Sequence, residues 1–206
     1  GSILGSSVTG YLATFGAATG LRQMSISRYS FGWWPNKLVA LLNVIQQIGW
    51  AAVGCITGGI ALSAVASHYL SPRVGVVIIA AISFCFSLLG LRVILVYERY
   101  AWIVFFVIFM ILFGEAAPYV DNKTPTSLEG SALPGAVLTL LAIVYGSSAS
   151  WCTIASDYYV EYPANENRIK VFLLTTLGLA VPTSIGMTAG AVAASTLNNQ
   201  PEIGRA

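Results

Sequence analysis

Apolar residues occur along the chain in six long runs, which are separated by connections that hold most of the charged residues. A membrane-spanning helix needs about 20 consecutive, mostly apolar residues, and the runs match this length. They do not alternate apolar and polar positions with a period of two, which excludes a closed barrel. The pattern predicts an all-α, polytopic transmembrane helical bundle that forms a single domain over residues 1–206. The predicted spans are residues 1–19, 38–66, 74–91, 100–120, 132–156 and 171–196.

Basic residues are distributed unevenly among the connections. Connections rich in Lys and Arg stay on the cytoplasmic side of a membrane. Three segments (21–37, 92–99 and 157–170) hold Arg22, Arg28, Lys37, Arg92, Arg99, Arg168 and Lys170, whereas the remaining connections and the C-terminal tail hold Arg73, Lys123 and Arg205. We therefore expect the three basic segments to face the cytoplasm and the visible N-terminus to start outside.

Polar residues recur at helical spacing in the second predicted span. Asn43, Gln46, Gln47 and Trp50 lie three and four residues apart, and Gly54 follows one turn after Trp50. An amide without partners in hydrocarbon costs several kcal/mol, so this stripe must face protein or water. Two interpretations stay open. The stripe is either a contact between helices or the wall of a cavity in which Trp50 offers a stacking surface.

The fifth predicted span contains a stretch that a purely lipid-facing helix does not need. The small residues Gly146, Ser147, Ser148, Ala149 and Ser150 directly precede Trp151, and the segment ends at Asp157. Small residues weaken a helix, and broken helices at membrane depth are tolerated only in a cavity wall or within protein. Trp151 lies about halfway along the span, away from the interfacial aromatic belts. The stretch is therefore either a packing seam or one broken helix of a binding site.

The composition supports a membrane protein and excludes other classes. Charged residues make up 9% of the chain, against about 25% in a soluble domain. A net charge of +2 without a basic run excludes a nucleic-acid partner. The cysteines share no metal-ligand spacing and no catalytic set occurs, so we expect neither a cofactor nor an enzyme. No Lys, Arg or Asp lies near the centre of a predicted span, which favours an uncharged substrate.

Two stretches carry a resemblance to a known family. They read GAATGLRQMSISRYSFGWWPNKLVALLNVIQQIGW and SASWCTIASDYYVEYP. Both resemble the purine–cytosine permeases of the nucleobase–cation symport family, most closely the fungal-type branch. The resemblance covers nearly the whole chain, as spans two to seven of about twelve. The chain also starts without Met inside an apolar segment. We therefore expect a fragment that is truncated at both ends.

The resemblance implies a partial five-plus-five inverted-repeat transporter fold with the substrate at mid-membrane. The fifth visible span corresponds to the family's broken sixth span, and its partner helices lie before Gly1 and after Ala206. Trp50 and Trp151 match two aromatic residues that hold a planar ring between them. The stretch that contains Ser147, Ser148 and Ser150 would supply backbone groups freed by unwinding.

The sequence departs from the family pattern one turn after Trp50. At that position the family carries a polar side chain that bonds the base, whereas this chain has Gly54. Loss of one hydrogen-bonding partner weakens discrimination among bases. Gln46 and Gln47 are possible substitutes, although they lie on the other side of Trp50. Together with Asn43 they are expected to line the cavity.

The resemblance implies a secondary active transporter that imports a nucleobase such as cytosine or a purine, with a proton as the coupling ion. One alternative is a transporter of another flat heterocycle, such as uracil, allantoin, a hydantoin or a vitamin, which Gly54 favours. A second alternative is a degenerate fragment that transports nothing. We expect an integral protein of the plasma membrane, with the nucleobase and the lipid bilayer as its partners. The sequence does not define an oligomeric state.

Overall fold

The computed structural model describes residues 1–66, 69–116, 118, 130 and 132–199, and within these ranges every regular element is a helix. The prediction of an all-α fold is therefore confirmed. The chain forms two compact units, which are described separately. The first contains residues 1–36 and 109–206, and the second contains residues 37–108.

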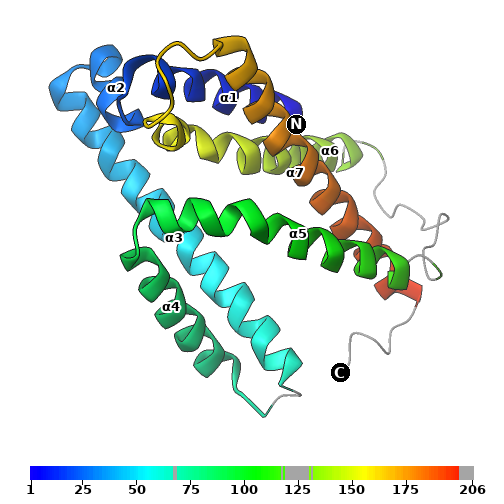
Figure 1. The fold of residues 1–206 in the computed structure, drawn as a ribbon. Coiled ribbons are helices and arrows are strands. Elements are labelled where there is room, and N and C mark those ends of the chain that lie inside the picture. The colour runs from blue at the N-terminus through cyan, green and yellow to red at the C-terminus, as the bar shows by residue number, and fades with distance from the viewer. Residues whose placement is uncertain (67–68, 117, 119–129, 131, 200–206) are drawn as a thin grey trace. The chain divides into compact units, whose positions relative to one another are not determined.

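Helix α1 (Ser2–Thr19) forms the centre of the first unit. It packs along α6 (Ala132–Ala149) and α7 (Arg168–Asn199), as Figure 1 shows. It also contacts two short 3₁₀ helices that follow α6, η2 (Ser150–Thr153) and η3 (Ala155–Tyr159). Gly20, with φ of 64°, ends α1 and leads into α2 (Gln23–Phe31). A positive φ is cheap only for glycine, which explains the residue at this turn.

Most buried residues of this unit are small, and several are polar. Ser6 and Ala13 on α1 are completely buried, as is Ser156 in η3, whereas large apolar side chains such as Leu4 are exposed. Lipid tails are as apolar as Leu, so membrane helices associate through small residues and leave large apolar ones outside. The distribution is therefore typical of membrane-spanning helices.

Glycines allow α1 to approach its neighbours closely. A Cβ atom at Gly5 would lie 2.5 Å from a backbone carbonyl oxygen of α6, and one at Gly16 would overlap the Ser156 carbonyl oxygen. Hydroxyl groups connect the same helices. Thr9 Oγ1 donates a hydrogen bond of 2.9 Å to the Ser148 carbonyl oxygen in α6. The contact between α1 and α6 thus combines close backbone packing with interhelical hydrogen bonds.

The second unit contains most of α3 (Trp33–Val65), α4 (Pro72–Leu88) and the first part of α5 (Leu91–Ala116). Helices α3 and α4 cross closely at two glycines, because a Cβ atom at Gly75 would lie 2.5 Å from the Gly59 carbonyl oxygen. Near this crossing, Ser63 Oγ donates a hydrogen bond of 2.6 Å to the Leu70 carbonyl oxygen. Gly90, with φ of 83°, forms the turn into α5.

Among the described residues, four helices are long and apolar enough to cross a membrane. They are Trp33–Val65, Val93–Ala116, Ala132–Thr153 and Arg168–Ser195, and Pro72–Leu88 is a shorter apolar helix. The segment predicted as the first span also forms a helix, α1, which does not meet the same criterion.

Helix boundaries differ from the predicted spans in several places. The first connection contains α2, and α3 begins at Trp33 rather than near residue 38. Pro35 lies in the first turn of α3, where a missing N–H group costs nothing. The predicted connection 92–99 belongs to α5, because an apolar run follows the turn at Gly90 without a further helix-breaking residue. Residues 117, 119 and 120 of the fourth predicted span lie outside the described residues.

Candidate functional site

The helix of the fifth predicted span is interrupted at Ser150. Gly146, Ser147, Ser148 and Ala149 remain α-helical in α6, and the chain then continues as the 3₁₀ helices η2 and η3. Between these two, Ile154 leaves the helical conformation, with φ of −130° and ψ of 6°. A helix interrupted at membrane depth exposes backbone groups that a ligand can use. The interruption therefore begins at the last residue of the small-residue stretch.

Hydroxyl groups explain why the α-helix ends there. Ser150 Oγ donates to the Ser147 carbonyl oxygen at 2.9 Å, and Thr153 Oγ1 donates to the Ser150 carbonyl oxygen at 3.2 Å. Side chains that bond to carbonyl groups three residues back compete with the backbone N–H groups of an α-helix. The backbone bond from the Ile154 N–H to the Trp151 carbonyl oxygen follows the tighter 3₁₀ pattern.

Ser148 faces α1. Its side chain is 1% exposed, and its hydroxyl lies 3.4 Å from the Ser2 hydroxyl, while its carbonyl oxygen accepts the bond from Thr9. Within this chain, Ser148 therefore takes part in helix packing. Ser147 and Ser150 are half-buried. The stretch therefore packs against α1, and the helix is interrupted at its last residue, while its role in a binding site stays a prediction.

Trp151 lies in the first 3₁₀ turn after the interruption, and 42% of its surface is exposed. Its ring centroid is 6.4 Å from that of Tyr158, with an angle of 53° between the planes. This tilted contact orients the indole and leaves part of its surface accessible. An accessible indole is suited to stacking against a flat ring.

Helix α3 carries the other predicted residues on the second unit. Trp50 is half exposed, and Asn43 accepts a hydrogen bond of 3.4 Å from Gln47 one turn later. Gln46, like these two amides, is partly buried. A Cβ atom at Gly54 would meet no neighbour within 4 Å, so there is open space one turn after Trp50. Trp50 and Trp151 lie on different units.

A polar junction at the far end of the interrupted segment was not identified from the sequence. Asp157 Oδ1 accepts a hydrogen bond of 2.7 Å from the backbone N–H of Gln23, the first residue of α2. Ser156 Oγ lies 2.7 Å from both the Leu12 carbonyl oxygen and Gln23 Oε1. The junction connects the end of η3 to the start of α2. In the sequence, two features pointed to this junction. The Asp157 carboxylate ends an apolar segment, and the connection that contains α2 is basic.

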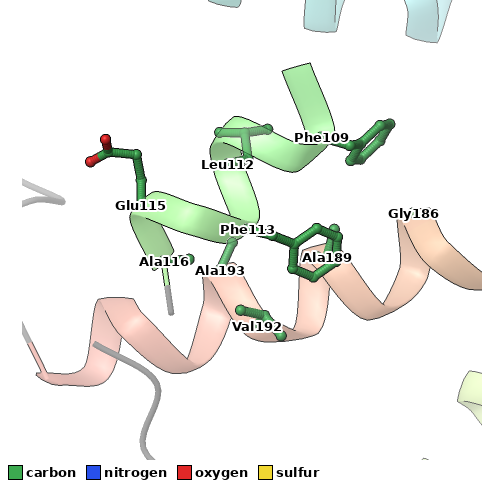
Figure 2. A pocket seen from close by; sticks show the side chains of 10 residues that line it. Phe109, Leu112, Phe113, Glu115, Ala116, Gly186, Ala189, Val192 and Ala193 are labelled. Carbon is green, nitrogen blue, oxygen red and sulfur yellow. The ribbon is translucent and has the colours of Figure 1, made fainter. Parts of the chain in front are cut away.

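A groove between α5 and α7 lies within the first unit and contains none of the predicted residues. Its volume is about 580 Å³, and it is lined by Phe109, Leu112, Phe113, Glu115, Ala116, Gly186, Ala189, Gly190, Val192 and Ala193. Figure 2 shows Phe113 directed toward α7, whereas the Glu115 carboxylate points away from that helix. The lining is almost entirely apolar. It therefore lacks the convergent polar groups that orient a small heterocycle.

Neither a metal site nor a disulfide occurs in the described part of the chain. No group of three His, Cys, Asp or Glu residues could hold a metal ion there, and Cys55, Cys85 and Cys152 are unpaired thiols.

Comparison with known proteins gives a consistent result. A family model described as permease for cytosine/purines, uracil, thiamine and allantoin matches residues 1–203. A purine-cytosine permease of Emericella nidulans is 36% identical over 181 residues, which are 88% of this chain and 35% of the relative. A purine-cytosine permease of Saccharomyces cerevisiae is 30% identical over 203 residues, 97% of this chain and 38% of the relative. No solved structure matches the chain significantly.

A further relative is named for a different substrate. The vitamin B6 transporter of Saccharomyces cerevisiae is 30% identical over 187 residues, which are 87% of this chain and 32% of the relative. The chain thus spans about a third of the length of these relatives. These relatives are named as permeases or transporters rather than as enzymes, which agrees with the predicted class of protein. A match from residue 1 to residue 203 shows that the chain belongs to the family of permeases for cytosine/purines, uracil, thiamine and allantoin.

Proposed function

We propose that the full-length protein is a secondary active transporter that imports a nucleobase, such as cytosine or a purine, across the plasma membrane together with a proton. The observation that carries the proposal is the interruption of α6 at Ser150, directly before a half-exposed Trp151. An uncharged heterocycle needs flat contact surfaces and hydrogen-bonding groups at its edge. The 3₁₀ turns and the indole provide both kinds of group in one segment.

In this mechanism the substrate ring stacks on the exposed surface of Trp151. Offset stacking is favourable for flat rings and tolerates different substituents. Polar groups at the ring edge then select among substrates, because an unpaired buried polar group costs more than a lost contact. The described chain spans a third of its relatives' length, so the complete site is a property of the full-length protein.

A second candidate substrate class is supported by Gly54. A side chain is absent one turn after Trp50, and the space beside this glycine is open. Such a site accepts a bulkier or differently substituted heterocycle, and one relative is a vitamin B6 transporter. Pyridoxine, uracil and allantoin are therefore the competing substrates to test.

The test is uptake by the full-length protein in cells that lack their own nucleobase permeases. Radiolabelled cytosine, adenine and hypoxanthine are compared with uracil, allantoin and pyridoxine, and surface protein is quantified in parallel. Saturable uptake of cytosine or a purine that a protonophore abolishes is the expected result. Uptake of pyridoxine, uracil or allantoin alone supports the second candidate. Surface protein without uptake of any of these compounds contradicts both and supports a degenerate protein.

A further inference from the structure

Helix α2 buries two polar residues, whereas its two aromatic residues are exposed. Gln23 and Ser27 are 6% and 9% exposed, and Ser27 Oγ donates a hydrogen bond of 2.6 Å to Asn36 Oδ1. By contrast, Tyr29 is 78% exposed and Phe31 is 56% exposed. A helix on the surface of a soluble protein has the opposite arrangement. The outward face of α2 therefore requires surroundings less polar than bulk water.

The exposed aromatic surface continues into the first turn of α3. Trp33 and Trp34 are 56% and 75% exposed. Trp and Tyr side chains are enriched where a membrane meets water, because one end of the ring system is apolar and the other polar. Helix α3 is long and apolar enough to cross a membrane, so its N-terminal turn lies at one end of a span. Helix α2 immediately precedes this turn, which places it at the membrane surface.

The same surface carries positive charge. Arg22 and Arg28 are exposed, and residues 21–37 contain no Asp or Glu. The Arg28 guanidinium carbon lies 4.5 Å from the centroid of the Trp33 ring. A guanidinium that stacks on an indole directs its N–H donors outward in its own plane, where they match the paired oxygens of a phosphate. Arg28 is thereby oriented by a contact that leaves its donors available to an anion.

We propose that α2 and the first turn of α3 bind the headgroup of an anionic phospholipid. The phosphate oxygens accept hydrogen bonds from Arg28, and Arg22 adds a second positive charge. Trp33 and Tyr29 lie beside the upper acyl chain. An anionic lipid fits better than a zwitterionic one, because this segment offers cations and no acid to pair with a choline or ethanolamine group. The basic-residue distribution places the segment on the cytoplasmic side, where anionic lipids are concentrated.

Lipid binding here also affects the interrupted helix. Asp157 of η3 accepts a hydrogen bond from the Gln23 N–H, and Gln23 begins α2. A lipid that holds α2 in place therefore stabilises the junction with η3. The inference does not depend on which substrate the protein carries, and its test needs no transport measurement.

The test uses the full-length permease, purified in detergent. Phosphatidylserine, phosphatidylinositol or phosphatidylcholine is added, and bound lipid is counted by native mass spectrometry while thermal unfolding is followed in parallel. We expect the anionic lipids to remain bound and to raise the unfolding midpoint more than phosphatidylcholine does. Arg28→Ala should weaken anionic-lipid binding about fivefold, which corresponds to about 1 kcal/mol for one basic residue at an anionic surface.

Two further variants and one additive make the result decisive. Arg28→Lys keeps the charge and should retain part of the binding. Arg73→Ala removes the same charge from an exposed position at the start of α4 and should leave binding unchanged. Inorganic phosphate alone should not reproduce the stabilisation. Equal effects of all three lipids, equal losses in the Arg28 and Arg73 variants, or full stabilisation by phosphate would overturn the proposal. Lipid binding that is independent of Arg28 would mean that another segment of the longer permease covers α2.

Discussion

Trp151 is the residue on which the proposed substrate site depends most. Its half-exposed indole follows the interruption of α6, and its contact with Tyr158 fixes its tilt. Stacking between a base and an aromatic side chain contributes about 1–3 kcal/mol, so Trp151→Ala should raise the KM for uptake by about 5- to 150-fold. Concentration-dependent uptake with normalisation to surface protein measures this change. Trp102→Ala removes another exposed indole and should leave KM unaffected. An unchanged KM in the Trp151 variant would assign the residue to packing.

Gly54 allows a test of how the base edge is recognised. An introduced Cβ atom meets no neighbour within 4 Å, so Gly54→Asn is sterically tolerated. A net hydrogen bond contributes about 0.5–1.5 kcal/mol, and the variant should therefore lower the KM for cytosine or a purine by about 2- to 10-fold. Gly49→Asn adds the same side chain at another open position of α3 and serves as the control. If the two variants behave alike, the assigned register on α3 is wrong.

Gly16 is the most restrictive glycine of α1. A Cβ atom there would overlap the Ser156 carbonyl oxygen, which belongs to backbone and cannot rotate away. Overpacking costs about 1–3 kcal/mol, so Gly16→Ala should lower the thermal unfolding midpoint of the purified full-length protein. Gly146→Ala meets no neighbour within 4 Å and should be neutral or stabilising, because Ala is the better helix former. A stable Gly16 variant would show that α1 and η3 separate more easily than their packing indicates.

At the scale of the elements, the sequence predicted the interrupted helix but not the residue at which it ends. Propensity alone suggested weakening from Gly146 onward. Packing decides the outcome, because Ser148 is buried against α1 and keeps the preceding turn α-helical. At Ser150 and Thr153, side-chain hydroxyl groups donate hydrogen bonds to backbone carbonyl oxygens three residues earlier. Such tertiary override of a weak preference is not visible in a single sequence.

Helix α2 shows a second limit of sequence-based prediction. Its apolar residues do not form the usual inward-facing stripe, since Gln23 and Ser27 occupy the buried face. A search for apolar periodicity therefore misses it. The basic residues of segment 21–37 were evident in the sequence, and they predicted the cytoplasmic side of the membrane rather than a helix.

Asp157 stabilises the first turn of α2 from a different element. The Asp157 carboxylate accepts the Gln23 N–H at 2.7 Å, and Arg22 at the N-cap position supplies no side-chain cap of its own. Loss of a cap costs about 0.5–2 kcal/mol, and a negative charge at a helix N-terminus adds about 0.3–1 kcal/mol. Asp157→Ala should therefore lower the unfolding midpoint, and Asp157→Asn should lower it less. Glu161→Ala removes an exposed acid close by and should have little effect. Equal midpoints for all three variants would show that the cap contributes nothing.

At the scale of the whole molecule, helix length leaves the number of membrane crossings open. Helices α1 and α4 have 18 and 17 residues, which corresponds to about 27 and 25 Å at about 1.5 Å per residue. The hydrocarbon core is about 30 Å thick, and shorter helices cross it only with local thinning or support from neighbouring helices. Neither length nor composition decides whether α1 and α4 cross the membrane. The distribution of basic residues predicts that every predicted span crosses it.

The sidedness of three exposed positions tests this prediction. In the described part of the chain, the α-helices α3 to α6 lie between Ser30 in α2 and Ala164 before α7. If α3, α5 and α6 cross, Ser30 and Ala164 lie on the same side only if α4 crosses as well. Ser71, between α3 and α4, should lie on the opposite side. Cysteines are introduced at these positions in a full-length protein without its native cysteines and labelled with an impermeant maleimide. We expect Ser71→Cys to react in intact cells, and Ser30→Cys and Ala164→Cys to react only after permeabilisation. Labelling of Ala164→Cys in intact cells would show that α4 does not cross, because the loss of one crossing reverses the side of every later connection.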